Sequence, residues 1–433
     1  MNHSAYEIAL TLVYLAMWVC TLVWYQLKRP RADAGTAIIS LYIVYGVFSY
    51  LTMRDEMFSM AFEPLKLFPY IFLYLMMLLA LSPVIYNHLN PPKEIEDPNT
   101  RMLSIIGWVA FACAVLMTPK ILADAQGGGL TAIMSDATAG KEAYTEQVMG
   151  AVDSGSKIRN LPAIIYNVLA DLPPFLIFYF LTKERKSKLM LLALAVTIAI
   201  GIYVPISSGQ RGGTISRLFT VLGAYLLFRQ YISSKINKFI TRAGIILALA
   251  IAIPLTAITL SRFGKERAGV EGFVSWYVGQ GSLYFNNYGL DNGGIRNGDR
   301  TMNLFKRIVD PNAPKNMFER RDRHRYLKID DNFFSTFVGD FTIDFGPVVA
   351  VLIFLVFNGI VFLLIRPRDG TIKVRQMLVL YLVVCINIQG GMTLYSFSDL
   401  GTMRIIVLAA LCIYMKYHEV LLRKFPLMEK KAN

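Results

Sequence analysis

The stretch GPVVAVLIFLVFNGIVFLLI, residues 346–365, decides the fold class, because it holds twenty consecutive residues without a charged side chain. A helix of about this length crosses the hydrocarbon core of a bilayer. Ten further apolar segments occur along the chain: 6–24, 36–53, 68–86, 102–118, 161–182, 189–206, 213–228, 243–260, 377–395 and 400–417. The sequence therefore predicts an all-α polytopic membrane protein with about eleven transmembrane helices, forming a single membrane-embedded unit over residues 1–433.

The composition agrees with this class. Hydrophobic residues make up 55% of the 433 residues and charged residues 17%, against roughly a quarter in soluble domains. The net charge of +14 is of the kind seen in nucleic-acid-binding proteins, but many of the basic residues flank apolar runs. We therefore expect membrane lipids, and no nucleic acid, as partners.

The basic residues that follow residues 346–365 give the orientation. Arg366, Arg368, Lys373 and Arg375 stand on the short segment after this span, and short segments rich in Lys and Arg face the cytoplasm. With alternation along the eleven spans, 22 basic residues fall on six short segments of the same side. The N-terminus is then predicted outside the cytoplasm and the C-terminus inside.

Two outer segments, 119–160 and 261–345, are too long to be simple connections. The second holds 13 Lys or Arg and 9 Asp or Glu between Arg262 and Asp331. Arginine binds phosphate oxygens through two parallel hydrogen bonds and stays charged, so this loop predicts a site for an anion such as pyrophosphate. A solvated amphipathic helix that attracts lipid headgroups is the alternative interpretation.

Three arginines outside this loop are further candidates for ligand binding. Arg211 lies in the glycine-rich turn SSGQRGG between two predicted spans, and a basic residue near membrane depth is a candidate functional residue. Arg217 and Arg404 fall inside predicted spans, where each is expected to bind a ligand or to pair with an acid such as Asp399. Asp171, beside two prolines in another span, is expected to pair with an intramembrane arginine or to carry a proton.

The candidate general bases lie in the large outer loop. His324 is the only histidine there, and Asp331 and Asp344 belong to an acidic group at the entry to residues 346–365. A neutral imidazole or a carboxylate can accept a proton from a sugar hydroxyl. Helix capping is the alternative role for Asp344. The sequence contains no nucleotide-binding fingerprint and no His/Cys metal cluster, so we expect no cofactor and no metal.

Two short motifs resemble a known family. Ser208-Gly209-Gln210-Arg211-Gly212 and the stretch from Gly339 to Gly346, together with the spans and the late outer loop, look like the bacterial O-antigen polymerases of the Wzy type. The resemblance implies a metal-independent glycosyltransferase of the bacterial inner membrane. Such an enzyme extends a polysaccharide at the periplasmic face and releases lipid pyrophosphate from undecaprenyl-pyrophosphate-linked repeat units.

The resemblance also implies roles for particular residues. Arg211 is the first choice for the pyrophosphate, and four further arginines are supporting candidates: Arg262, Arg267, Arg404 and Arg217. Asp331, Asp344 and His324 are the candidate bases, and a chain-length regulator is a possible protein partner. An O-antigen ligase and a flippase for lipid-linked oligosaccharide are the alternative functions.

Overall fold

The computed structural model describes residues 5–98, 101–126, 161–184, 186–207, 210–263, 269–314, 317–330, 333–367, 370–394 and 399–424. The described part is almost entirely helical, with one pair of very short strands. The chain divides into two compact units. Unit 1 comprises Met1–Ile95 and Glu271–Thr402, and unit 2 comprises Glu96–Val270 and Met403–Asn433.

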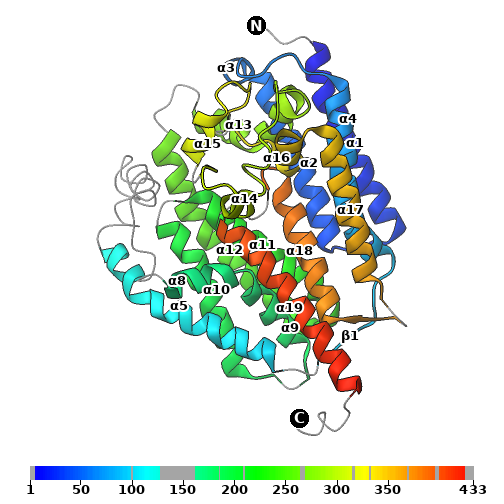
Figure 1. The fold of residues 1–433 in the computed structure, drawn as a ribbon, viewed down its shortest axis with the longest axis vertical. Helices are drawn as coiled ribbons and strands as arrows, with labels where there is room; N and C mark the ends of the chain where they lie inside the picture. The colour runs from blue at the N-terminus through cyan, green and yellow to red at the C-terminus, as the bar shows by residue number, and fades with distance from the viewer. Residues whose placement is uncertain are drawn as a thin grey trace. The chain divides into compact units, whose positions relative to one another are not determined.

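Unit 1 is built mainly from α-helices. Its elements are α1 (Ala5–Lys28), α2 (Ala34–Arg54), α3 (Glu56–Ser59), α4 (Leu67–Leu89), α13 (Gly269–Tyr284), the π-helix η2 (Phe285–Gly289), α14 (Asn303–Val309), α15 (Met317–Arg323), α16 (Thr336–Phe345), α17 (Pro347–Ile365) and α18 (Val374–Gly390). Strand β1 (Glu94–Glu96) pairs with β2 (Thr371–Lys373). Helix α4 is central because it packs against α1, α2, α17 and α18, and Figure 1 shows α17 running beside it.

Polar contacts compensate for Pro83 inside α4. Proline has no N–H, so the carbonyl of Leu79 loses its helical donor. The Ser82 hydroxyl donates to that carbonyl at 2.6 Å, and the buried Asn387 of α18 donates its Nδ2 to the next carbonyl, that of Ala80, at 3.1 Å. Asn387 thereby joins α18 to α4. The Tyr42 hydroxyl of α2 donates to the backbone carbonyl of Asn387 at 2.8 Å. Hydrogen bonds thus connect three helices of unit 1, α2, α4 and α18.

A second polar group fastens the ends of α1, α2 and α4. Asp33 caps α2 by accepting the N–H of Thr36 at 3.0 Å. Its carboxylate also accepts the Tyr25 hydroxyl at 2.9 Å and lies 2.6 Å from Nδ1 of His88. The rings of Tyr25 and His88 stack with centroids 3.7 Å apart. His88 therefore has a structural role at the ends of these helices.

Unit 2 is also helical. Its elements are α5 (Met102–Gln126), α8 (Leu161–Leu169), α9 (Leu172–Thr182), α10 (Lys188–Ser207), α11 (Arg211–Phe228), the 3₁₀ turn η1 (Arg229–Tyr231), α12 (Ser234–Phe263) and most of α19 (Asp399–Lys424). Helix α10 packs against α5, α9 and α11. The predicted span 161–182 is bent by 54° between α8 and α9, because Pro173 and Pro174 begin α9 and lack the donors that would continue α8.

Seven of the described helices are long and apolar enough to cross a membrane: α1, α2, α4, α5, α10, α12 and α17. The bent pair α8–α9 raises this number to eight if it forms one span. These helices coincide with eight of the predicted segments and confirm an all-α polytopic membrane protein. The other three segments coincide with α11, α18 and α19, which are not in this set, so the total of eleven spans stays a prediction.

Candidate functional site

Two buried arginine–aspartate pairs hold the loop that precedes α14 against α16 in unit 1. Asp340 and Asp344 stand four residues apart on α16 and therefore share one face of the helix. Nε of Arg300 lies 2.7 Å from Asp340, and Nε of Arg296 lies 2.8 Å from Asp344. Both carboxylates are fully buried. We call these four residues the Arg–Asp clamp.

Asp344 also organises the backbone of this loop. Its Oδ2 accepts the N–H of Thr301 at 2.7 Å, the hydroxyl of Thr301 at 2.8 Å and the N–H of Arg300 at 3.2 Å. These three donors hold the loop backbone at residues 300 and 301 against α16. The sequence predicted Asp344 either as a candidate general base or as a helix-capping residue. Its hydrogen bonds to the loop favour a structural role.

A carboxylate–imidazole pair lies in the same unit. Oδ2 of Asp299 lies 2.8 Å from Nε2 of His324, and both side chains are buried. Asp299 also pairs with Lys306 and lies 3.6 Å from Arg323. Burial works to raise the pKa of Asp299, but hydrogen bonds from Lys306 and His324 and the neighbouring positive charges outweigh it and lower the pKa below its ordinary value. Asp299 is therefore a charged partner that orients His324.

A pocket of about 560 Å³ opens beside His324. Four arginines line it, together with His324 and two acids: Arg296, Arg320, Arg321, Arg325, Asp322 and Asp330. Arg296 and Arg320 are buried, whereas Arg325 is exposed and pairs with Asp322 at 2.7 Å. We call this feature the arginine pocket. Its arginine-rich lining suits an anion, and Arg296 links it directly to the Arg–Asp clamp.

The two ring nitrogens of His324 have different surroundings. Nε2 faces Asp299, while Nδ1 lies 3.4 Å from the hydroxyl of Tyr326, which is a weak contact. If Nε2 donates its proton to Asp299, Nδ1 carries the lone pair and can accept a proton. The pocket thus combines anion-binding arginines with an oriented imidazole.

In unit 2, one acid contacts two arginines at the break between α8 and α9. Oδ1 of Asp171 lies 3.0 Å from Nη1 of Arg217, and Oδ2 lies 3.6 Å from Nη1 of Arg404. Nε of Arg404 donates to the carbonyl of Asn167 at 2.6 Å. The predicted pairing of Asp171 with intramembrane arginine is confirmed. The suggestion of Asp399 as the partner acid was wrong for Arg217, since Asp399 pairs with Arg307.

Arg211, which the sequence places within the turn SSGQRGG, is the first residue of α11. Its Nη1 donates to the hydroxyl of Thr259 in α12 at 3.3 Å, and its side chain is partly exposed. Gly213 in the first turn of α11 is close to α10, because a Cβ on Gly213 would lie 3.0 Å from Cβ of Pro205. Arg211 is thus held at a tight junction between α10 and α11.

Three of the other candidate residues predicted from the sequence lie wholly or partly outside the described part of the structure. Asp331 and Arg267 lie outside the described residues, and so do Ser208 and Gly209 of the first motif. Arg262 belongs to α12, but its side chain is not described. Of the candidates that are described, Arg217 and Arg404 meet at Asp171, and His324 faces the arginine pocket. Asp344 does not line that pocket, but it pairs with Arg296, which does.

Sequence reasoning missed Asp299, Arg296 and Arg300 as members of the site. A usable signal was present in the segment Asn292–Arg300, NGGIRNGDR, where glycines flank an arginine as they do around Arg211. Gly293 and Gly298 have φ angles of +87° and +80°, which glycine adopts without the strain of a side chain. These glycines allow the loop to bend around Arg296.

The described residues contain no group of three or more His, Cys, Asp or Glu side chains arranged to hold a metal ion. Comparison of the chain with protein-family models, with curated proteins and with solved structures gives no significant match. The resemblance to O-antigen polymerases therefore rests on the two short motifs and stays a prediction.

Proposed function

We propose that this chain is a glycan polymerase of the bacterial inner membrane. It transfers a growing glycan from undecaprenyl pyrophosphate to a lipid-linked repeat unit at the periplasmic face. The observation that carries the proposal is the arginine pocket, in which four arginines surround an imidazole held by a buried carboxylate. The predicted orientation, with the N-terminus in the periplasm and the C-terminus in the cytoplasm, places this loop on the periplasmic side.

The arginines supply the charge that the leaving group requires. When the bond between the anomeric carbon and the pyrophosphate oxygen breaks, the negative charge on the pyrophosphate increases. Guanidinium groups fixed in a pocket stabilise that charge without reorganisation of solvent. Arg296 and Arg320 are the buried members of the pocket and carry this role. No nucleotide is needed, because the lipid pyrophosphate activates the donor.

His324 acts as the general base in this proposal. The acceptor hydroxyl oxygen forms the new bond to the anomeric carbon, and its proton passes to Nδ1 of His324. Asp299, 2.8 Å from Nε2, stabilises the imidazolium that results. The deprotonated carboxylate is the appropriate state for this task, and the lowered pKa of Asp299 maintains it.

The test is a reconstitution with purified protein in liposomes, lipid-pyrophosphate-linked repeat units and no nucleotide. Formation of longer lipid-linked chains supports the proposal. We expect His324→Gln to lower the rate at least about 100-fold, and Arg296→Lys or Arg320→Lys to lower it by a similar factor. His418→Gln in α19 and Arg242→Ala on the exposed surface of α12 are matched controls that should retain full activity.

Arg211 is tested in the same assay, because the motif makes it the proposed pyrophosphate ligand in unit 2. Arg211→Lys should also lower the rate if this assignment holds. Transfer of glycan only onto lipid A-core would identify a ligase instead. Movement of lipid-linked sugar across the liposome without any glycan growth would identify a flippase. Dependence of product length on an added membrane protein would reveal a chain-length regulator.

A further inference from the structure

A second pocket, of about 550 Å³, lies within unit 2 where three helices end. Helix α5 begins at Met102, α9 ends at Thr182 and α10 begins at Lys188. The lining residues come from these three ends and from the segments beside them. Since α5 and α10 are apolar enough to span a membrane, the pocket lies at the level where spanning helices give way to polar segments.

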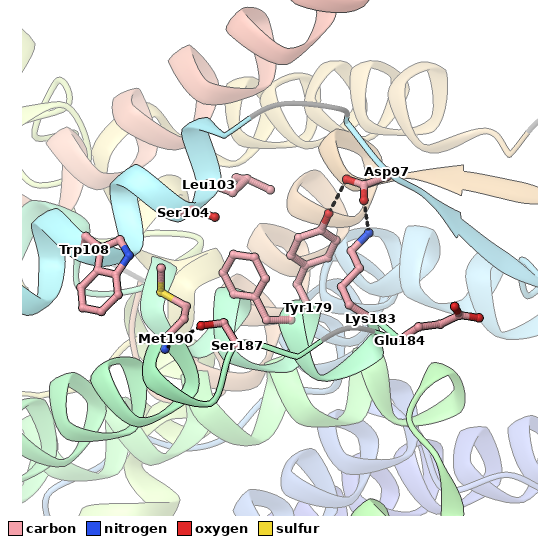
Figure 2. Close-up of a pocket in the computed structure, with 10 residues that line it drawn as sticks. Asp97, Leu103, Ser104, Trp108, Tyr179, Lys183, Glu184, Ser187 and Met190 are labelled. Atoms are coloured by element: carbon pink, nitrogen blue, oxygen red, sulfur yellow. Dashed lines mark hydrogen bonds and ion pairs between the residues drawn. The ribbon is translucent and has the colours of Figure 1, made fainter. Parts of the chain in front are cut away.

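The polar wall of this pocket is ordered by Asp97. Its Oδ1 accepts the Tyr179 hydroxyl at 2.8 Å, and its Oδ2 lies 2.6 Å from Nζ of Lys183. The Lys183 ammonium also lies 4.6 Å from the centroid of the Tyr179 ring. Figure 2 shows these three side chains meeting at one end of the pocket. The lysine is therefore held in place with donors left for another acceptor, because an ammonium group has three.

Two hydroxyl groups add further donors. Ser104 lies in the first turn of α5, and Ser187 precedes α10, where its oxygen accepts the N–H of Met190 at 3.3 Å. That contact leaves the hydroxyl hydrogen of Ser187 as a donor. The positive ends of two helix dipoles reinforce these donors, so this side of the pocket suits a phosphate group.

A carboxylate at the rim selects against a purely anionic ligand. Glu184 lines the pocket and is exposed, and its carboxylate is separate from the Asp97 group in Figure 2. Among the described lining residues, Asp97 and Glu184 carry two negative charges and Lys183 carries one positive charge. A ligand that brings both a phosphate and an ammonium group matches this distribution better than one that brings only a phosphate.

The remaining wall is apolar and continues onto an apolar surface. Leu103, Trp108 and Met190 line the pocket. Ile105, three residues before Trp108 in α5, and Leu189, next to Met190 in α10, are 55% and 65% exposed. Side chains of this kind at the end of spanning helices are covered by acyl chains when the protein is in a bilayer. This continuity favours a lipid over a soluble molecule.

We propose that this pocket binds the headgroup of an ethanolamine phospholipid. The phosphate accepts hydrogen bonds from Ser104, Ser187 and Lys183, and the primary ammonium donates to Glu184. The glycerol and the first part of the acyl chains lie against Trp108 and Met190. The site is independent of the arginine pocket and of the proposed reaction.

Native mass spectrometry of the purified full chain tests this proposal with three lipids of identical acyl chains: phosphatidylethanolamine, phosphatidylcholine and phosphatidylglycerol. We expect phosphatidylethanolamine to bind at least about tenfold more tightly than the other two, since a quaternary ammonium donates no hydrogen bond and phosphatidylglycerol has no cation. Glu184→Gln should remove the preference, while Glu56→Gln, an exposed acid on α3, should leave it unchanged.

Ser104→Ala provides a second variant, because none of the described hydrogen bonds uses this hydroxyl, so folding should be unaffected. It should weaken binding of all three lipids by a similar factor. Equal binding of the three lipids by the wild-type protein would overturn the proposal, as would an unchanged preference in Glu184→Gln. Displacement of the lipid by soluble phosphoethanolamine at equal concentration would assign the pocket to a water-soluble ligand and would also overturn it.

Discussion

The Arg–Asp clamp makes a quantitative prediction about Asp344. Asp344→Asn preserves the shape of the side chain and one acceptor oxygen for the donors at Arg300 and Thr301, but it removes the charge opposite Arg296. The side chain of Arg296 is only 2% exposed, so its guanidinium has little access to water. Removing one partner of a buried ion pair costs about 3–5 kcal/mol. We expect a loss of this size in the free energy of unfolding.

The measurement is equilibrium unfolding in mixed detergent micelles titrated with a denaturing detergent. Asp322→Asn is the matched control, because Asp322 pairs with Arg325 on the surface, where the two side chains are 65% and 79% exposed. An exposed pair contributes about 0.5 kcal/mol or less. The variant Arg296→Met, alone and combined with Asp344→Asn, completes a double-mutant cycle with an expected coupling of about 1–3 kcal/mol.

Two results would refute this reasoning. The first is an Asp344→Asn variant that unfolds like Asp322→Asn. The second is additivity of the Arg296→Met and Asp344→Asn losses, which would mean that the two side chains do not interact. A fully stable but inactive Asp344→Asn protein would return Asp344 to the role of general base.

Because the pKa of Asp299 is lowered, its charged form should stabilise the loop 261–345 above the ordinary pKa of an aspartate, about 3.9. This contribution should be lost as the pH falls from that ordinary value through the lowered one. Limited proteolysis of the loop, as the pH is lowered from 6 to well below about 3.9, should show this loss, and Asp299→Asn should abolish the dependence. Asp171→Asn should destabilise unit 2 by about 3 kcal/mol, because Arg217 and Arg404 both contact this acid and their side chains are 17% and 18% exposed. Unfolding titrations would measure the loss in the free energy of unfolding. A loss smaller than that of Asp322→Asn would contradict the prediction. Gly213→Ala should lower the free energy of unfolding by about 1–3 kcal/mol, because the new Cβ would lie 3.0 Å from Cβ of Pro205. Gly244→Ala is the control that should not destabilise the protein, because no described atom outside the adjacent helix backbone lies within 4 Å of the added Cβ.

The arginines of the loop 261–345 have different surroundings in the clamp and in the arginine pocket. Arg300 is committed to Asp340, and it also donates to the Thr393 hydroxyl at 3.3 Å. Arg320 and Arg321 line the pocket instead. Arg296 does both, since it pairs with Asp344 and lines the pocket. Substitution of Arg300 is therefore expected to destabilise the loop, whereas substitution of Arg296 should affect both the loop and the lining of the pocket.

The amino-acid sequence by itself determined the fold class. Whether a segment enters a membrane depends on its own length and apolarity, and these properties are present in the sequence before any tertiary contact forms. The segment 346–365 is thus found as α17 (Pro347–Ile365), within a residue of the expected start. The two prolines beside Asp171 are also visible in the sequence, and the bend between α8 and α9 lies at them because a proline interrupts a helix.

The tertiary structure alone decided which charges meet. Asp344 accepts donors from Arg300 and Thr301, more than forty positions earlier in the chain. Asp299 and His324 are likewise 25 positions apart and become neighbours only in the folded loop. Charge pairing depends on distance in space, and the composition of a basic loop does not specify it. The sequence therefore predicted an anion site in the loop 261–345, and the fold showed which arginines line a pocket there and which acid orients His324.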